Sequence, residues 1–219
     1  MTKRSTSLAF HVPDIGDEEV TAVAEALRSG WLTTGPKVRA FELDFAHYIG
    51  TPHAVAVNSC TAALHLALDA VELSEGDEVL VPTMTFAATA EVVLYFKARP
   101  VLVDCEPDTL NLDPAGLEQA ISRRTRALIP VHYAGHPCEM ARILEIARTY
   151  RLKIIEDAAH ALPASYNGQR VGTFGELACF SFYATKTLCT GEGGMVTTAN
   201  PEYAESVRMM SLHGISKDA

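Results

Sequence analysis

A single lysine, Lys186, follows an apolar run that is typical of a β-strand, and a glycine-rich segment comes directly after it. The apolar run is 180–184, and the glycines are Gly191, Gly193 and Gly194. A lysine acts as a nucleophile near neutral pH when apolar surroundings or a nearby cation lower its pKa. Four neighbours are expected to supply apolar surroundings: Phe180, Phe182, Tyr183 and Leu188. The segment therefore predicts a reactive amine rather than a surface lysine.

A carboxylate and an imidazole lie close together in the stretch "KIIEDAAH". Asp157 ends a strand-like run, and His160 follows three residues later. A carboxylate at the end of a strand often caps a loop, but it can also pair with a cationic group of a ligand. His160 is close enough in sequence to reach the same ligand.

The stretch "VNSCTAAL" passes directly from a strand pattern to a helix pattern. Its small hydroxyl residues Ser59 and Thr61 fall at the predicted start of the helix, where free backbone N–H groups and the helix dipole attract anions. The alternative is an ordinary N-cap formed by a hydroxyl side chain. The stretch matches neither glycine-rich nucleotide-binding motif, G-x-x-x-x-G-K-[ST] or G-x-G-x-x-G.

The three features together predict one ligand. An anion site, a carboxylate for a ring nitrogen and an amine for an aldehyde are the groups that pyridoxal 5′-phosphate (PLP) requires. We expect the phosphate at the helix start, the pyridinium nitrogen at Asp157 and the aldehyde at Lys186.

The elements that must position these residues alternate along the chain. Helix patterns cover 17–30, 38–50, 58–71, 87–98, 113–121, 138–150 and 201–214. Strand patterns cover 53–57, 77–82, 99–104, 126–132, 152–157, 177–183 and 194–198. Strands separated by helices predict an α/β fold with three α/β/α layers and a mostly parallel sheet. Ligands of such sheets bind beyond the carboxyl ends of the strands, where the candidate residues lie.

Composition narrows the class of protein. The 219 residues are 48% hydrophobic and carry a formal net charge of −9, without a basic block of five residues, so nucleic acid is not an expected partner. The chain has no apolar run of about 18 residues and no apolar leader at its N-terminus, so neither a membrane span nor a signal peptide is expected. Five widely spaced cysteines without a C-x-x-C pair predict a reduced, cytoplasmic protein.

The order of several longer stretches resembles one family. These stretches are "LTTGPKVRAFELDFAHYIG", "AVNSCTAALHLAL", "GDEVLVPTMTFAATA", "PVLVDCEPDTLNLDP", "IPVHYAGHPCEM", "IEDAAHALPASYNGQRVGTFGE", "CFSFYATKTLCTGEGGMVTT" and "LHGISKDA". From about Trp31 to the last residue, the chain is similar to the DegT/StrS-type PLP-dependent sugar aminotransferases. The resemblance implies the aspartate-aminotransferase fold (fold type I), a homodimer, and transfer of an amino group from glutamate to a nucleotide-linked keto sugar. "VHYAG" and "EDAAH" favour a UDP-linked 4-keto sugar.

The resemblance also implies a role for individual residues. Lys186 matches the lysine that forms the Schiff base with PLP, and Asp157 matches the partner of the pyridinium nitrogen. His160 matches a residue near the phenolic oxygen of the cofactor. Three residues match the phosphate-binding positions and one matches the aromatic ring that stacks on the cofactor: Cys60, Thr61, Ser181 and Phe86. Many members have Gly at the position of Cys60 and Pro at that of Ala184.

The family continues past "HGISKDA" into a small C-terminal domain. We therefore expect residues 1–219 to comprise the N-terminal segment and the large PLP-binding domain, with the small domain absent from this chain.

Four other interpretations remain open. A dehydratase of the same family has histidine at the position of Lys186, so the lysine favours transamination. A relative that aminates cyclitols would have the same motifs. A protein or inactive fragment that binds PLP without turnover would keep the cofactor site and lack the reaction. His132, His136 and Cys138 could hold a metal ion, although their irregular spacing is more typical of a polar loop.

Overall fold

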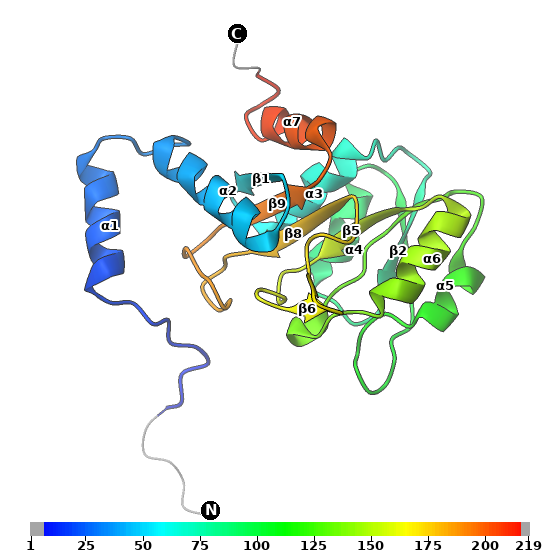
Figure 1. Cartoon of the computed structure of the whole chain (residues 1–219). Helices are drawn as coiled ribbons and strands as arrows, with labels where there is room; N and C mark the ends of the chain where they lie inside the picture. The colour runs from blue at the N-terminus through cyan, green and yellow to red at the C-terminus, as the bar shows by residue number, and fades with distance from the viewer. Residues whose placement is uncertain (1–6, 216–219) are drawn as a thin grey trace, which may run out of the picture.

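The computed structural model describes residues 7–215 and has three layers, with helices on both faces of a central sheet (Figure 1). The last residues of the motif "LHGISKDA", 216–219, lie outside the described part of the chain. The sheet has seven strands in the order β1-β9-β8-β5-β4-β2-β3. Strand β9 runs antiparallel to β1 and β8, and the other neighbours are parallel. The predicted α/β architecture with a mostly parallel sheet is therefore confirmed.

The helices and strands have the following bounds. The strands of the large sheet are β1 (His53–Val57), β2 (Glu78–Pro82), β3 (Arg99–Val103), β4 (Thr125–Leu128), β5 (Lys153–Asp157), β8 (Leu177–Ser181) and β9 (Gly194–Thr198). The helices are α1 (Asp17–Arg28), α2 (Pro36–Ile49), α3 (Cys60–Ala70), α4 (Ala87–Leu94), α5 (Pro114–Ala120), α6 (Met140–Tyr150) and α7 (Pro201–Met210). A 3₁₀ turn, η1, covers Tyr133–Gly135.

Alternating side chains of each strand build the core on both faces of the sheet. In β2, Val79 and Val81 pack on the face covered by α3, α4 and α7, whereas Leu80 packs with α5 and α6 on the other face. A third cluster lies where α2 packs Phe45 against Phe180 of β8. Because both faces are covered, β2 has three consecutive buried apolar residues, Val79, Leu80 and Val81, as is typical of parallel sheets.

Four predicted elements extended too far. Strand β4 ends at Leu128 and β8 ends at Ser181. Helix α4 ends at Leu94, because the chain turns at Lys97 with φ of 55°, and α7 ends at Met210. Beyond the last regular hydrogen bond, the sequence of each of these segments still has the apolar pattern of a strand or a helix. The pattern alone therefore overestimates the length of the strand or helix.

One hairpin was not predicted. Strands β6 (Ser165–Tyr166) and β7 (Gln169–Arg170) pair through a turn at Asn167 and Gly168, both with positive φ. The Asn-Gly pair in "SYNGQR" is a strong hairpin signal and could have revealed it.

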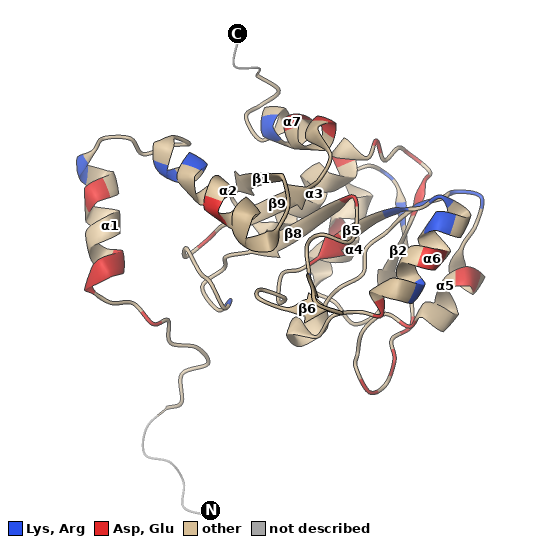
Figure 2. Ribbon diagram, viewed as in Figure 1, with Lys and Arg blue, Asp and Glu red and all other residues tan. Residues whose placement is uncertain are grey.

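Helix α1 forms as predicted, but its apolar face is not buried. Val20, Val23 and Leu27 are each about 60% exposed, and the helix stands apart from the sheet (Figure 1). Its first turn is acidic, whereas Lys and Arg are dispersed over several elements, including α2, α6 and α7 (Figure 2).

A buried carboxylate, Glu156, joins β5 to two loops. Its side chain is fully buried and accepts hydrogen bonds from the amides of Gly172, Phe174 and Gly175 at 2.8–2.9 Å. His132 Nε2 lies 3.1 Å from the same carboxylate, and His132 Nδ1 accepts a hydrogen bond from the amide of Cys138. An accepting Nδ1 places the proton of the neutral ring on Nε2, so His132 donates to Glu156.

We expect Glu156→Gln to lower the free energy of unfolding by about 3 kcal/mol, because an amide group would face donors that need acceptors. Urea denaturation of the variant measures the loss. Glu145→Gln on the exposed side of α6 is the matched control, with an expected change within about 0.5 kcal/mol. Equal stability of the two variants would contradict this role of Glu156.

Candidate functional site

A cavity of about 760 Å³ lies at the edge of the sheet where β2, β5 and β8 end. All eight residues singled out in the sequence contribute to its wall: Ser59, Cys60, Thr61, Phe86, Asp157, His160, Ser181 and Lys186. These residues come from four separate segments of the chain. The parallel strands bring them together because their carboxyl ends share one edge.

The first turn of α3 forms one wall. Ser59 is the N-cap, and its Oγ accepts a hydrogen bond from the amide of Ala62 at 3.1 Å, so the N-cap interpretation of the hydroxyl is confirmed. The amides of Cys60 and Thr61 precede the first intrahelical bond, from Ala63 N to Ser59 O. Helix geometry leaves such amides available for an anion at the cavity.

Strand β9 approaches this turn closely. A Cβ atom on Gly194 would lie 2.5 Å from the carbonyl carbon of Ser59 and 2.8 Å from the nitrogen of Cys60. Only glycine fits here without displacing the backbone at the start of α3. Ser181, opposite Gly194 in the β8–β9 ladder, also contributes to the cavity wall.

Asp157 is the last residue of β5 and is only 4% exposed. Its Oδ2 accepts a hydrogen bond from the hydroxyl of Thr89 at 2.8 Å, and its Oδ1 accepts one from the amide of Ala159 at 3.2 Å. Both carboxylate oxygens are therefore held in place by hydrogen bonds. Asp157 also contributes to the cavity wall.

Lys186 lies in the turn that joins β8 to β9, half-buried in the cavity wall. Its amide donates to Tyr183 O, and the turn is closed by bonds from Phe182 N to Gly193 O and from Thr190 N to Phe182 O, each 2.9 Å. Burial lowers the pKa of Lys186, and the nearby Cys60 and Asp157 offset part of this effect. The predicted lowering of its pKa is therefore found.

The apolar surroundings of Lys186 differ in part from the prediction. Tyr183 lines the cavity with Lys186 as expected, but Phe180, Phe182 and Leu188 do not line it. Phe180 and Phe182 are fully buried and pack against Phe45 of α2, with ring centroids 5.1 and 5.5 Å apart. They point away from the cavity because alternate residues of a strand face opposite sides. Distant segments also contribute apolar residues to the cavity wall, Leu64 and Val131 among them.

Cys60, beside Lys186, is held as a neutral thiol. Burial raises the pKa of Cys60 well above its usual value, and the negative charge of Asp157 raises it further. We therefore assign Cys60 no nucleophilic role.

His160 presents a hydrogen-bond donor in the cavity wall. Its Nδ1 accepts from the amide of Ala134 at 3.3 Å, which places the proton of the neutral ring on Nε2. Burial and the neighbouring Lys186 lower the pKa of His160, although Asp157 opposes them. The imidazole is therefore neutral at physiological pH, with Nε2 as its donor.

Several lining residues were not found in the sequence. Tyr133 and Glu192 border the cavity from loops, and Thr89 borders it from the start of α4. Phe86, which was predicted, lies at the rim with 77% of its surface exposed. A threonine in the first turn of the mainly apolar helix "AATAEVVL", where Glu91 is the other polar residue, is a signal that could have identified Thr89.

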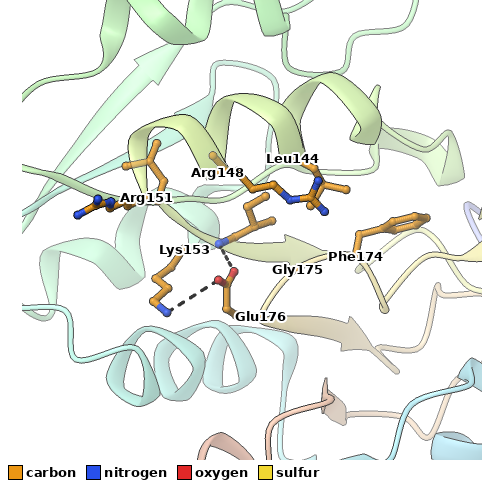
Figure 3. A pocket seen from close by; sticks show the side chains of 10 residues that line it. Leu144, Arg148, Arg151, Lys153, Phe174, Gly175 and Glu176 are labelled. Atoms are coloured by element: carbon orange, nitrogen blue, oxygen red, sulfur yellow. Dashed lines mark hydrogen bonds and ion pairs between the residues drawn. The ribbon is translucent and has the colours of Figure 1, made fainter.

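A second cavity, of about 450 Å³, lies beside α6 and the start of β5 (Figure 3). Glu176 accepts a hydrogen bond from the amide of Ile154 at 2.7 Å and lies 3.9 Å from the ammonium group of Lys153. Arg148 and Arg151 also line this cavity. It contains none of the predicted site residues.

The residues considered for a metal ion have other partners. His132 and Cys138 belong to the buried network around Glu156, and the thiol of Cys138 donates to Val131 O. Within residues 7–215, no group of three or more histidine, cysteine, aspartate or glutamate side chains is arranged to hold a metal ion.

The three-layer fold and this cavity define a class of α/β proteins that hold a ligand at the carboxyl ends of parallel strands. Within that class, the chain belongs to the DegT/DnrJ/EryC1/StrS aminotransferase family, whose model matches residues 13–219. The predicted family is confirmed.

Similar proteins support this assignment. The chain is 54% identical over 207 residues to the uncharacterized protein MJ1066 of Methanocaldococcus jannaschii. The aligned residues cover 94% of this chain and 54% of MJ1066. It is 50% identical over 217 residues to the spore coat polysaccharide biosynthesis protein SpsC of Bacillus subtilis, and the aligned residues cover 99% of this chain and 56% of SpsC. The structure of the putative sugar aminotransferase Spr1654 of Streptococcus pneumoniae in its PMP-form superimposes with a TM-score of 0.93 at 39% identity, covering 98% of this chain and 59% of that one.

These similarities confirm fold type I as the fold of the chain. The chain spans about half the length of the curated relatives it matches.

Proposed function

We propose that residues 1–219 comprise the N-terminal segment and the large PLP-binding domain of a sugar aminotransferase. The whole protein would transfer an amino group from glutamate to a nucleotide-linked keto sugar, with a UDP-linked 4-keto sugar as the acceptor we favour. The observation that supports this proposal is the meeting of the α3 N-terminus, Asp157 and Lys186 in one cavity.

The residues of the cavity suit PLP. The free amides of Cys60 and Thr61, with Ser181 nearby, offer donors to a phosphate. Asp157 offers an acceptor to a ring N–H, and the Nε2 proton of His160 offers a donor to a phenolic oxygen. Phe86 offers an aromatic face at the rim. Thus each polar group of the cofactor has a partner of matching chemistry.

Bound PLP supplies an electron sink for the carbon that loses its proton. Lys186 Nζ would hold the aldehyde group of the cofactor, and its free amine would take the proton from the Cα atom of glutamate as a general base and return it as a general acid. Its lowered pKa favours the neutral amine that both roles need. Asp157 keeps the ring nitrogen protonated. The same residues act in the reverse direction when the keto sugar receives the amino group.

The names of similar proteins support a sugar as the acceptor. SpsC is named for spore coat polysaccharide biosynthesis, and Spr1654 is named as a putative sugar aminotransferase. Spr1654 has also been solved in its PLP-form. Glutamate as the donor, the nucleotide, a homodimer and a cytoplasmic location are part of the proposal through the family resemblance. In residues 7–215, no helix is both long and apolar enough to cross a membrane.

The experiment that tests the cofactor site is borohydride reduction of the chain after addition of PLP, followed by peptide mass mapping. We expect a visible absorbance band that borohydride removes, and a phosphopyridoxyl group on Lys186. A label on other lysines alone would contradict the site. Release of 2-oxoglutarate after addition of glutamate then distinguishes a transaminase from a protein that only binds the cofactor.

Gly194→Ala should weaken PLP binding at least about ten-fold, because the new Cβ would displace the backbone at the start of α3, where we place the phosphate. Fluorescence titration with PLP measures the change. The control is Gly116→Ala, where a Cβ would meet only Val103 Cγ1, at 3.3 Å, away from the cavity. Unchanged affinity in Gly194→Ala would remove the α3 start from the phosphate site.

A further inference from the structure

Thr89 is a fully buried hydroxyl residue in the first turn of α4. The other polar residue of α4, Glu91, is exposed, whereas Thr89 lies among the buried residues of the helix with Ala88, Val92 and Val93. A buried hydroxyl costs stability unless it forms hydrogen bonds. Thr89 forms its bond with Asp157 Oδ2, at 2.8 Å, across 68 positions of the chain.

The donor and the acceptor in the hydrogen bonds among Thr85, Thr89 and Asp157 follow from the number of protons that each group can donate. An ionised carboxylate only accepts, so the single hydroxyl proton of Thr89 goes to Asp157. Thr85 Oγ1 lies 2.6 Å from Thr89 Oγ1, and it must therefore be the donor of that pair. The result is a series of two hydrogen bonds, in which Thr85 donates to Thr89 and Thr89 donates to Asp157. Both threonines border the cavity.

These two hydrogen bonds restrain the Asp157 carboxylate on the side of α4. The amide of Ala159 restrains the other oxygen, at 3.2 Å. Rotation of the carboxylate would break at least one of the two bonds. Each oxygen of a carboxylate can accept about two hydrogen bonds, so positions remain for a donor from the cavity.

We infer that Thr89, supported by Thr85, is a positioning residue that orients Asp157 toward the ring nitrogen of the cofactor. The inference rests on the proposed function, because it assumes that Asp157 pairs with that nitrogen. Thr89 acts through the carboxylate to which it is hydrogen-bonded.

The test compares Thr89→Val, which removes the hydroxyl but keeps the shape, with Thr89→Ser, which keeps the hydroxyl. Both are measured in the 219-residue chain with PLP. We expect Thr89→Val to bind PLP about ten-fold more weakly, since hydrogen bonds to charged groups are among the strong ones. Thr89→Ser should restore the affinity. Thr51→Val is the matched control, because the hydroxyl of Thr51 also forms one buried bond, to Thr198 O at 2.8 Å, outside the cavity.

A second readout separates positioning from a purely structural role. The pH at which the absorbance of PLP on Lys186 changes should move upward in Thr89→Val. The reason is that a positive ring nitrogen disfavours a second positive charge nearby, and Asp157 would hold that ring charge less firmly. The pH should not move in Thr51→Val, even if urea denaturation shows that both variants lose stability.

Two results would overturn the inference. Thr89→Val could bind PLP and respond to pH as the wild type does, or Thr89→Ser could lose as much affinity as Thr89→Val. By contrast, the proposed function itself would be overturned if borohydride reduction of the wild-type chain with PLP left no phosphopyridoxyl group on Lys186. The role of Thr89 would then be overturned with it.

Discussion

Lys186→Ala is expected to abolish amino transfer, with a loss of at least about 10³-fold, because the variant lacks both the amine for the cofactor aldehyde and the general base. Borohydride reduction after addition of PLP should leave no label on the peptide that contains position 186. Lys186→Arg should be equally inactive, because a guanidinium group stays protonated in proteins. A positive charge at this position is therefore not sufficient.

The matched control for this loss is Lys153→Ala. Lys153 is also a partly buried lysine, but it lies at the start of β5 beside Glu176, in the second cavity (Figure 3). The control should keep wild-type labelling at Lys186 and wild-type release of 2-oxoglutarate. If Lys186→Ala kept the turnover of the wild type, the assignment of the amine would be wrong.

Asp157→Ala is expected to lower the rate of amino transfer by about 10²–10³-fold, because no carboxylate would remain to hold the positive charge on the ring nitrogen. Asp157→Asn should show a similar loss. An asparagine side chain can still accept one of the bonds from Thr89 and Ala159, so this variant tests charge with less change in packing. Single-turnover release of 2-oxoglutarate from glutamate measures both variants.

Asp104→Asn is the control for this second prediction. Asp104 follows β3 at the same edge of the sheet, and its Oδ1 accepts a hydrogen bond from the amide of Cys105 at 2.9 Å. Its replacement should leave the release of 2-oxoglutarate unchanged. A mild effect of Asp157→Asn and Asp157→Ala alike would mean that the ring nitrogen is held by another group.

The sequence alone determined the kind of each element and most of the site. Periods of two and of 3.6 residues are local patterns, and they identified every strand of the large sheet and every α-helix within residues 7–215. The alternation of strands and helices implied parallel pairing, and parallel pairing implied a site at the carboxyl ends. Eight residues chosen on that basis and through the family resemblance meet in one cavity.

The tertiary structure decided what depends on residues far apart in the chain. The strand order and the antiparallel β9 follow from packing, which no local period encodes. The same is true of the cavity that holds Lys186, because Phe180 and Phe182 pack in the core instead, whereas Leu64 and Val131 from distant segments line the cavity. The hydrogen bond from Thr89 to Asp157 exists only because α4 packs beside the end of β5. Sequence patterns report on neighbours within about one turn or strand, whereas burial and hydrogen bonds between distant residues are set when the whole core is packed.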